Sequence, residues 1–271
     1  MELWKTMEET FKVQKEKVDT IEVVEIDDIP PVGDMKLEIG KWYKLRNLVS
    51  LYVDMVGSTK FTNDKSEKAS AKMYEMFTGS LVKILKYSDY QAEYIDIKGD
   101  GGFALWKGKY ASIMAVLAAV TFKTYVEKQL KGYVKSQVAD WNISSKMGIF
   151  KDTVLVKRIG ERDTKDTQYN WAVWAGRPVN LSSKLSSIAE NDKLLISEDV
   201  LNDISQKEFK KYLVRSCGCD GSGNTREPKD LWVEKTDSVM QFDSKIFKLE
   251  SKWCDVHGEE FINSIIEKMK E

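Results

Sequence analysis

Asp54 stands in a segment, VDMVGSTKFT (residues 53 to 62), whose residue types suit the binding of a phosphate group. The carboxylate is followed by Gly57, Ser58 and Thr59, which we expect to form a loop that enters a helix. Backbone N–H groups point outward at such a loop, and the helix dipole favours an anion there. The segment therefore predicts a phosphate-binding turn beside a carboxylate.

A second carboxylate, Asp100, lies in the glycine-rich segment IKGDGGFALW (residues 97 to 106), which predicts a β-hairpin turn. If this hairpin pairs with the strand that ends at Asp54, the two acids meet at one sheet edge. Two carboxylates beside a phosphate-binding turn are what Mg²⁺ or Mn²⁺ needs to hold a triphosphate. Two such cations would lower the pKa of an attacking hydroxyl and neutralise the charge that develops on phosphorus.

Each acid also has an ordinary interpretation. An aspartate in a GDGG segment is a common turn residue, and an aspartate at a strand end often caps a helix. Their occurrence on consecutive elements favours chemistry. A third segment, AGRPVNLSSKL (residues 175 to 185), places Asn180 and Lys184 four residues apart, and so on one face of a predicted helix. We expect this pair to hold a ribose and a phosphate oxygen.

The hydrophobic periodicities predict an α+β fold, with helices over a mainly antiparallel sheet and a ferredoxin-like βαββαβ core. The domains we expect are an N-terminal helix and extended arm (1–47), a catalytic domain (48–207) and a small C-terminal Cys/His extension (208–271). Within the catalytic domain we expect a strand over 48–54, a helix over 66–86, two strands around the glycine turn and a helix over about 110–130. We then expect a strand pair within 141–160 that turns at Lys151-Asp152. A strand that ends near 176 and a helix with Pro178 in its first turn complete the prediction.

The composition gives no argument for a nucleic-acid or membrane partner, because the formal net charge is −1. The N-terminus is charged throughout, and the longest apolar run, residues 113 to 122, is about half of a membrane span. Three cysteines without a signal peptide indicate a reducing cytoplasm, where thiols stay free or bind metal.

The C-terminal segment contains every cysteine and the single histidine of the chain. Cys217 and Cys219 form one pair, and Cys254 and His257 form another. Four such ligands would close a tetrahedral structural zinc site. The alternative is an inert buried thiol and a surface histidine, and the long gap between the pairs is not a standard zinc-finger spacing.

On these motifs the chain resembles the catalytic domain of class III nucleotidyl cyclases, over roughly residues 48 to 200. The matching segments occur in the order of the family: VDMVGSTKF (53–61), IKGDGGFALW (97–106), GIFKDTVLVKRIG (148–160) and GRPVNLSSKL (176–185). The resemblance implies a homodimer with sites at the interface and two Mn²⁺ or Mg²⁺ ions per site. It also implies cyclisation of a nucleoside triphosphate with loss of pyrophosphate.

Carried over by position, the resemblance implies a role for each site residue. The metal ligands are Asp54, Met55 and Asp100, and Asn180 is the asparagine that contacts the transition state. Lys184 takes the place of the arginine that the family usually has. The substrate-binding residues implied in the same way are Gly57, Ser58, Thr59, Lys98, Val173 and Trp174.

The chain departs from adenylate cyclases at both positions that read the base. Asp96 replaces a lysine, although Lys98 follows on the same strand face, and the second position falls near Val173, between Trp171 and Trp174. Aromatic side chains there favour a smaller ring by stacking, and Tyr94 is a further aromatic expected near the base. The tryptophans are equally typical of sheet core.

The segments GKWYKLRNLVSLYVDMVGSTKF (40–61) and KGDGGFALW (98–106), together with Lys184, look most like the pyrimidine (cytidylate or uridylate) cyclases of bacterial Pycsar antiphage systems. That resemblance implies UTP or CTP as substrate and a cyclic-nucleotide-responsive effector as an indirect partner. The alternatives are an adenylate or guanylate cyclase with altered base contacts and an inactive nucleotide-binding sensor. A cyclic dinucleotide synthase is disfavoured, because KGDGGF (residues 98 to 103) is only superficially like its GGDEF hairpin.

Overall fold

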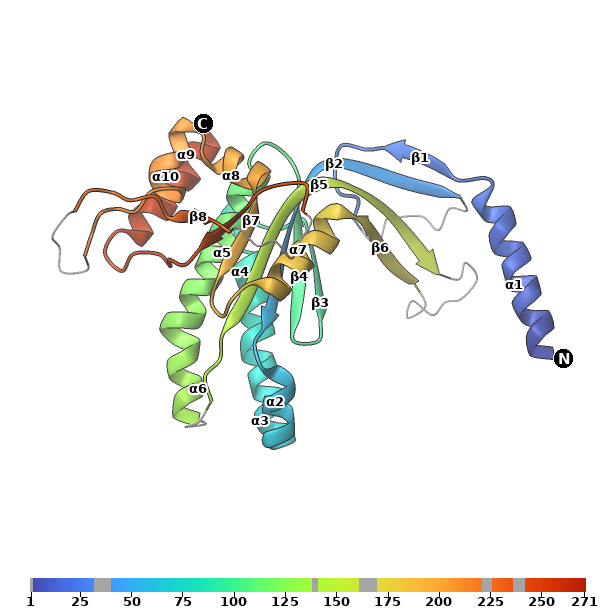
Figure 1. The fold of residues 1–271 in the computed structure, drawn as a ribbon, viewed down its shortest axis with the longest axis horizontal. Helices are drawn as coiled ribbons and strands as arrows, with labels where there is room; N and C mark the ends of the chain where they lie inside the picture. The colour runs from blue at the N-terminus through green and yellow to red at the C-terminus, as the bar shows by residue number, and fades with distance from the viewer. Residues whose placement is uncertain (1, 32–39, 138–140, 161–169, 221–225, 236–241) are drawn as a thin grey trace. The chain divides into compact units, whose positions relative to one another are not determined.

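The computed structural model describes residues 2–31, 40–137, 141–160, 170–220, 226–235 and 242–271 (Figure 1). The chain forms two compact units. One comprises Leu48–Asp152 and Arg177–Glu271, and the other comprises Met1–Asn47 and Thr153–Gly176.

Strands of the larger unit belong to a mixed sheet with the order β3-β4-β2-β5-β7-β9-β8. The pairs β2–β4, β3–β4, β7–β9 and β8–β9 are antiparallel, whereas β5 and β7 are parallel. The order β3-β4-β2-β5 is that of a ferredoxin-like βαββαβ unit, as the sequence predicts. The strands are β2 (Lys41–Met55), β3 (Tyr94–Lys98), β4 (Gly101–Trp106), β5 (Ser145–Gly160), β7 (Leu194–Ser197), β8 (Trp232–Glu234) and β9 (Ile246–Leu249).

One face of this sheet carries the main hydrophobic core. Alternate residues of β2, among them Leu51, Val53 and Met55, pack there with Ala104 and Trp106 of β4. The helices whose apolar residues complete this core are α2 (Ser58–Asp64), α3 (Glu67–Tyr74), α4 (Ser80–Leu85), α5 (Ala111–Tyr125), α8 (Glu198–Ile204), α9 (Lys207–Leu213) and α10 (Gly258–Lys270), and the turn Ser88–Tyr90 lies beside them. Two π-helical turns, Glu75–Gly79 and Val126–Leu130, continue α3 into α4 and α5 into α6 (Lys131–Gln137).

The opposite face is covered by α7 (Arg177–Ile188). Because side chains alternate along a strand, Ser50 points to this face, and its Oγ lies 2.9 Å from Ser182 Oγ of α7. Gly148 of β5 allows the close approach, since a Cβ there would lie 2.7 Å from the backbone nitrogen of Ser186. A smaller apolar cluster, which includes Leu185, fills the rest of this layer. The sheet is therefore covered by helices on both faces.

The structure corrects two sequence-based predictions within this sheet. We expected residues 141 to 160 to turn at Lys151-Asp152, but β5 is one continuous strand of 16 residues. The two polar residues are held by ion pairs: Lys151 Nζ lies 2.8 Å from Asp203, and Asp152 lies 2.8 Å from Arg177. Strand β2 also begins at Lys41, earlier than the predicted residue 48.

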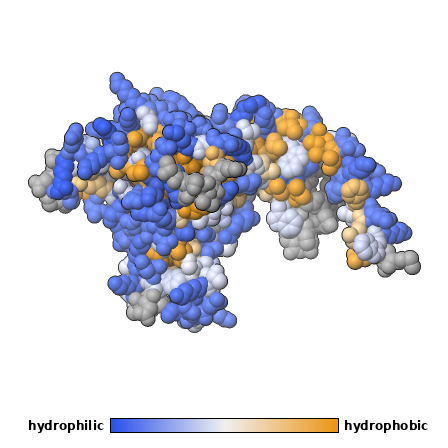
Figure 2. Space-filling model, viewed as in Figure 1, coloured by the Kyte–Doolittle hydropathy of each residue, from blue (hydrophilic) through white to orange (hydrophobic). Residues whose placement is uncertain are grey.

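The smaller unit contains α1 (Glu2–Val18), β1 (Glu22–Glu25), the first part of β2, the last part of β5, and β6 (Asn170–Gly176). β1 runs parallel to β2, and β6 is antiparallel to β5. Figure 2 shows hydrophobic residues among hydrophilic ones along α1, where Trp4 and Phe11 are 68% and 70% exposed. Val23 and Trp171 are exposed as well. Among the described residues, no helix has both the length and the apolar content that a membrane crossing requires.

Candidate active site

Asp54 and Asp100 come together at one end of the β2–β4 pair. The strand register places Asp54 opposite Gly101, so Asp100, the preceding residue in the hairpin turn, is its neighbour. Burial raises the pKa of Asp54, and the negative charge of Asp100 raises it further. Lys146 of β5 opposes this effect. The two carboxylates that the sequence singled out are therefore close enough to repel each other.

Glycine at position 101 makes this approach possible. A Cβ on Gly101 would overlap the carbonyl oxygen of Val53 and would lie 3.2 Å from Asp54 Oδ1. Gly99 begins the hairpin turn with a φ of 61°, a left-handed conformation that side chains other than glycine rarely adopt. The glycines around Asp100 thus serve the approach of two acids as well as the turn itself.

The loop after Asp54 also reaches the second acid. Ser58 is buried, and its Oγ donates a hydrogen bond to Asp100 Oδ2. Gly57 precedes α2 with a φ of 78°, and a Cβ there would lie 2.9 Å from the Trp141 ring. Thr59 is exposed at the same helix start. The segment that we predicted as a phosphate-binding turn therefore contacts the carboxylate pair.

These residues fit a divalent cation of the Mg²⁺ or Mn²⁺ class. Both ions prefer oxygen ligands, and the pair offers two carboxylates with a hydroxyl beside them. The unfavourable proximity of two like charges is relieved when a cation binds between them. Asp54 and Asp100 would hold such an ion.

The raised pKa of Asp54 predicts an effect on stability. The folded protein binds this proton more tightly than the unfolded chain, whose Asp pKa is ordinarily 3.8. The stabilising contribution is therefore present below that value and is lost as the pH rises through the raised pKa. At neutral pH and without metal, the ionised carboxylate destabilises the fold. We expect Asp54→Asn to raise the melting temperature of EDTA-treated protein by a few degrees.

Differential scanning fluorimetry at pH 7.5 checks this prediction. Asp64→Asn, which removes an exposed carboxylate of α2, is the matched control and should melt like the wild type. Added Mn²⁺ should raise the melting temperature of the wild type and leave Asp54→Asn nearly unchanged. A lower melting temperature for Asp54→Asn in EDTA would show that this carboxylate is not under electrostatic strain.

Five of the side chains that share the sheet face of Asp54 lie next to it or to one another. The β2–β4 and β3–β4 registers align Tyr52 with Phe103 and Asp96, and they place Tyr94 and Lys98 on either side of Asp96. The ring centres of Tyr94 and Phe103 lie 5.8 Å apart, and Lys98 Nζ lies 3.0 Å from Asp96. The sheet surface beside Asp54 and Asp100 is thus mainly aromatic, and it carries the ion pair between Asp96 and Lys98.

Sequence reasoning missed Tyr52. Burial raises the pKa of its phenol, and the charge of Asp54 raises it further, while the Ser183 side chain of α7 hydrogen-bonds to it. The residue therefore lies between the carboxylates and α7. The signal was available, because a tyrosine two residues before Asp54 on one strand must share its face. Lys146, whose charge acts on Asp54, was also missed, and nothing in its local sequence marks it.

Asn180 and Lys184 occupy exposed positions of α7, as the predicted helix face requires. The amine of Lys184 lies over the ring of Phe242, 5.5 Å from its centre. Within the part of the chain that the structure describes, no hydrogen bond or ion pair joins either residue to Asp54 or Asp100. Arg177, at the start of the same helix, is held by Asp152 and Asp243 at 2.8 and 2.9 Å.

Comparison with known proteins shows to which family the chain belongs. Residues 43–227 match the family described as "Adenylate and Guanylate cyclase catalytic domain". The chain belongs to this cyclase family. It is 30% identical over 246 residues to a protein named "Uridylate cyclase" from Micromonospora echinofusca, covering 88% of this chain and 75% of that protein. It is 32% identical over 247 residues to another from Propioniciclava tarda, covering 89% and 73%.

Solved structures agree on the fold. The adenylyl cyclase CyaB from P. aeruginosa aligns with a TM-score of 0.60 at 17% identity, over 79% of this chain and 98% of that one. The guanylyl cyclase Cya2 aligns with a TM-score of 0.57 at 15% identity, over 76% and 92%. The predicted α+β cyclase fold is confirmed, and the chain is an enzyme of the nucleotidyl cyclase class.

The other residues that the family resemblance singled out, Met55, Val173 and Trp174, lie in different environments. The Met55 side chain is 3% exposed within the apolar core, so only its backbone carbonyl is left as a metal ligand. Val173 and Trp174 belong to β6 in the smaller unit, where Trp174 is buried and Trp171 is 55% exposed. The base-reading roles that the resemblance gave to Val173 and Trp174 stay predictions.

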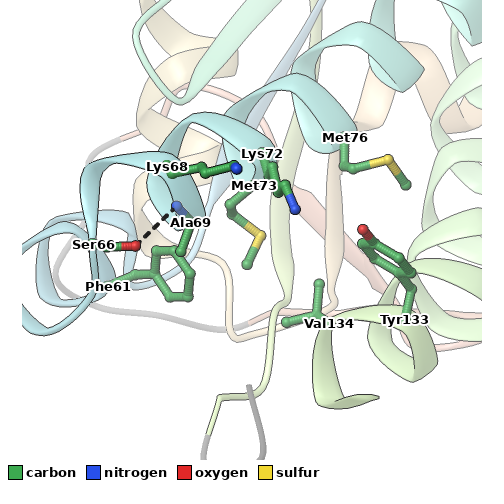
Figure 3. A pocket seen from close by; sticks show the side chains of 9 residues that line it. All are labelled: Phe61, Ser66, Lys68, Ala69, Lys72, Met73, Met76, Tyr133 and Val134. Atoms are coloured by element: carbon green, nitrogen blue, oxygen red, sulfur yellow. Dashed lines mark hydrogen bonds between the residues drawn. The ribbon is translucent and has the colours of Figure 1, made fainter. Parts of the chain in front are cut away.

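A separate cavity of about 200 Å³ lies between α2–α3 and α6 (Figure 3). Lys68 and Lys72 of α3 line it together with Met73, Met76 and Tyr133. It contains no carboxylate. Its lining therefore offers a divalent cation no carboxylate ligand, in contrast to the end of β2.

Two of the C-terminal cysteines and the histidine also come together, in segments that contain none of the residues proposed for the cyclase site. Ligand atoms of Cys217, Cys254 and His257 all lie within 4.8 Å of one another. Burial disfavours the Cys254 thiolate, but the backbone N–H groups of His257 and Val256 outweigh it and lower the pKa of Cys254 to about 6. Burial raises the pKa of Cys217.

Proposed function

We propose that the chain is a uridylate cyclase, which converts UTP to 3′,5′-cyclic UMP and pyrophosphate. The observation that carries the proposal is its identity of 30% and 32%, over nearly nine-tenths of its length, to two proteins named for that activity. The shared cyclase domain and the acid pair support the reaction type. CTP is the second pyrimidine substrate to be tested.

In the proposed reaction the ribose 3′ oxygen bonds to the α-phosphorus, the bond from that phosphorus to the pyrophosphate oxygen breaks, and the proton of the 3′ hydroxyl passes to solvent water. Asp54 and Asp100 would hold two divalent cations close to the triphosphate. When bound, these ions favour loss of the hydroxyl proton and offset charge on phosphorus. Ser58 orients Asp100 through its hydrogen bond. The N–H groups of Asn180 and Lys184 donate hydrogen bonds to the phosphate oxygens as negative charge develops there.

We propose that the active enzyme is a homodimer in which α7 of one protomer serves the carboxylates of the other. The exposure of Asn180 and Lys184 supports this arrangement. So does the smaller unit, which exposes large apolar side chains of α1, β1 and β6 that a monomer would leave in water. The domain boundaries at residues 48 and 208 stay part of this proposal.

The base site proposed for uracil is the aromatic face beside Asp54. Asp96 stands where adenylate cyclases usually have a lysine, and Lys98 is already paired with it at 3.0 Å. An acceptor next to a donor complements the N3–H and O4 edge of uracil. Tyr52, Phe103 and Tyr94 occupy the same face and leave less room for the larger purine ring.

Substrate preference is the expected result that tests this function. We expect kcat/KM for UTP to exceed that for ATP and GTP by roughly ten- to several-thousandfold, because a purine would lose hydrogen bonds to Asp96 and Lys98 and has less room between the aromatic side chains. Each nucleotide is assayed alone with Mn²⁺, and the cyclic product is quantified by mass spectrometry. CTP should be used less well than UTP. Equal or faster turnover of ATP or GTP would assign an adenylate or guanylate cyclase, and no product from any nucleotide would assign an inactive sensor.

Following the resemblance to Pycsar cyclases, we also propose that cyclic UMP is a second messenger in antiphage defence. A separate effector protein that binds the cyclic nucleotide would read the signal. The support for this role is the family resemblance alone, and infection of cells that carry the enzyme with and without Asp54→Asn tests it.

A further inference from the structure

A cluster of sulfur and nitrogen ligands lies outside the cyclase site, where the chain after α9 meets the chain before α10. Cys217 follows α9, and His257 is the residue that immediately precedes α10. Figure 1 shows α9 and α10 next to each other. The two segments are far apart in sequence, yet the cluster brings together the only histidine and at least two of the three cysteines of the chain.

The spacing of the ligand atoms suits a tetrahedral metal ion. Cys254 Sγ and His257 Nδ1 lie 3.8 Å apart, and both lie within 4.8 Å of Cys217 Sγ. In a tetrahedral zinc site, Zn–S distances of about 2.3 Å and Zn–N distances of about 2.0 Å separate neighbouring ligand atoms by roughly 3.5 to 3.8 Å. The Cys254–His257 distance already matches such a separation, and the distances from the Cys217 sulfur to these two atoms exceed it by no more than about 1 Å.

Cys219, two residues after Cys217, is the candidate for a fourth ligand, although its sulfur is not among the three ligand atoms that lie within 4.8 Å of one another. Gly218, between them, has a φ of 74°, and a Cβ there would overlap the carbonyl oxygen of Arg226. The backbone nitrogen of Arg226 donates to Gly218 O at 2.6 Å, which closes the turn. The backbone N–H of Cys219 points at the Cys217 sulfur, and the Cys219 thiol is near enough to act on it electrostatically.

Backbone donors surround the second pair in the same way. The N–H groups of Val256 and His257 are directed at the Cys254 sulfur. Such N–H groups stabilise a thiolate, the form of cysteine that binds metal. Soft sulfur ligands with one imidazole favour zinc over the Mg²⁺ or Mn²⁺ of an oxygen site.

We propose that Cys217, Cys219, Cys254 and His257 bind one structural zinc ion, which ties the segment after α9 to the start of α10. Four protein ligands leave no position for substrate, so the ion is a cross-link within the C-terminal extension and has no part in catalysis. Nearby Asp255 is not a ligand, because its carboxylate is paired with Lys128.

Metal content of the full-length purified protein tests this proposal. We expect about one zinc per chain by inductively coupled plasma mass spectrometry, as a closed four-ligand site binds one ion. Cys254→Ser and His257→Ala should lose most of it. Asp255→Asn, in the same loop, is the matched control and should retain it. Asp54→Asn should also retain it, which separates this site from the cyclase metals and from the proposed function.

Cobalt(II) replacement identifies the ligands directly. The cobalt form should show the visible absorption of a tetrahedral ion and a strong thiolate-to-metal charge-transfer band in the ultraviolet. Cys219→Ser should weaken that band by roughly a third, since one of three thiolates is lost. An unchanged band would remove Cys219 from the ligand set and overturn the four-ligand site.

The wild-type protein alone gives a test if the variants do not fold. Chelation of zinc should lower its melting temperature by several degrees, and Zn²⁺ but not Mg²⁺ should restore it. Wild-type protein that has no zinc, binds no cobalt and reacts with a thiol reagent at all three cysteines would overturn the proposal. A Cys217–Cys254 disulfide in freshly purified protein would overturn it as well.

Discussion

Replacement of Asp54 or Asp100 by asparagine lowers turnover of the cyclase by about a thousandfold or more, with little loss of folded protein. A factor of that size corresponds to about 4 kcal/mol of activation free energy. Asp54 lies opposite Gly101 in the β2–β4 pair, and Asp100 directly precedes that glycine. Each replacement removes a negative charge that would hold a divalent cation at the triphosphate. Steady-state formation of cyclic nucleotide with Mn²⁺ measures the effect.

The control for this prediction is Asp64→Asn, which changes an exposed carboxylate of α2 and should keep nearly full activity. Circular dichroism and the melting temperature verify the fold of each variant. Because Asp54→Asn removes a partly buried charge that Asp100 also repels, this variant should be at least as stable as the wild type. If either site variant turns over substrate at near wild-type rates, the metal site lies elsewhere.

A mixture of two inactive variants should regain activity. Asp54→Asn protein lacks a metal ligand, and Asn180→Ala protein lacks a donor on α7. If sites form between protomers, a mixed dimer has one site with both defects and one site with neither. Random exchange places half of the protein in mixed dimers, so activity should return to about one quarter of the wild-type level.

The geometry makes this test informative. Asn180 is exposed on α7, and in the described part of one chain it makes no hydrogen bond to Asp54 or Asp100. Subunit exchange is verified by native mass spectrometry of differently tagged proteins. Asp54→Asn mixed with Asp100→Asn is the matched control and should stay inactive, because both defects lie in the same half of the site. If exchange is complete and the first mixture stays inactive, each site is built within one chain.

The predictable parts of the molecule were those with local signals. The acids beside glycine, the proline in the first turn of α7 and the two strands expected around the glycine turn all predicted elements that the structure contains. The site itself needed pairing between distant strands, and the motif order supplied that pairing through the family resemblance. Tyr52 could have been found from its strand position alone.

Other features depend on tertiary contacts that a local pattern does not carry. Lys151 and Asp152 predicted a turn from their residue types. In the structure they continue strand β5, where Asp203 and Arg177 form ion pairs with them. β2 extends back to Lys41, where β1 pairs alongside it. The approach of Cys217 to Cys254 and His257 was predicted from composition, because every cysteine and the only histidine occurred in two short pairs.

The measurement that tests the central claim most directly is a competition among nucleotides. Purified protein is incubated with equal concentrations of ATP, GTP, CTP and UTP and with Mn²⁺, and the cyclic products are separated and identified by mass spectrometry. An Asp54→Asn preparation made in parallel measures any contaminating cyclase. The account predicts that cyclic UMP is the main product and is absent from the Asp54→Asn sample. Formation of cyclic AMP or cyclic GMP faster than cyclic UMP would contradict it.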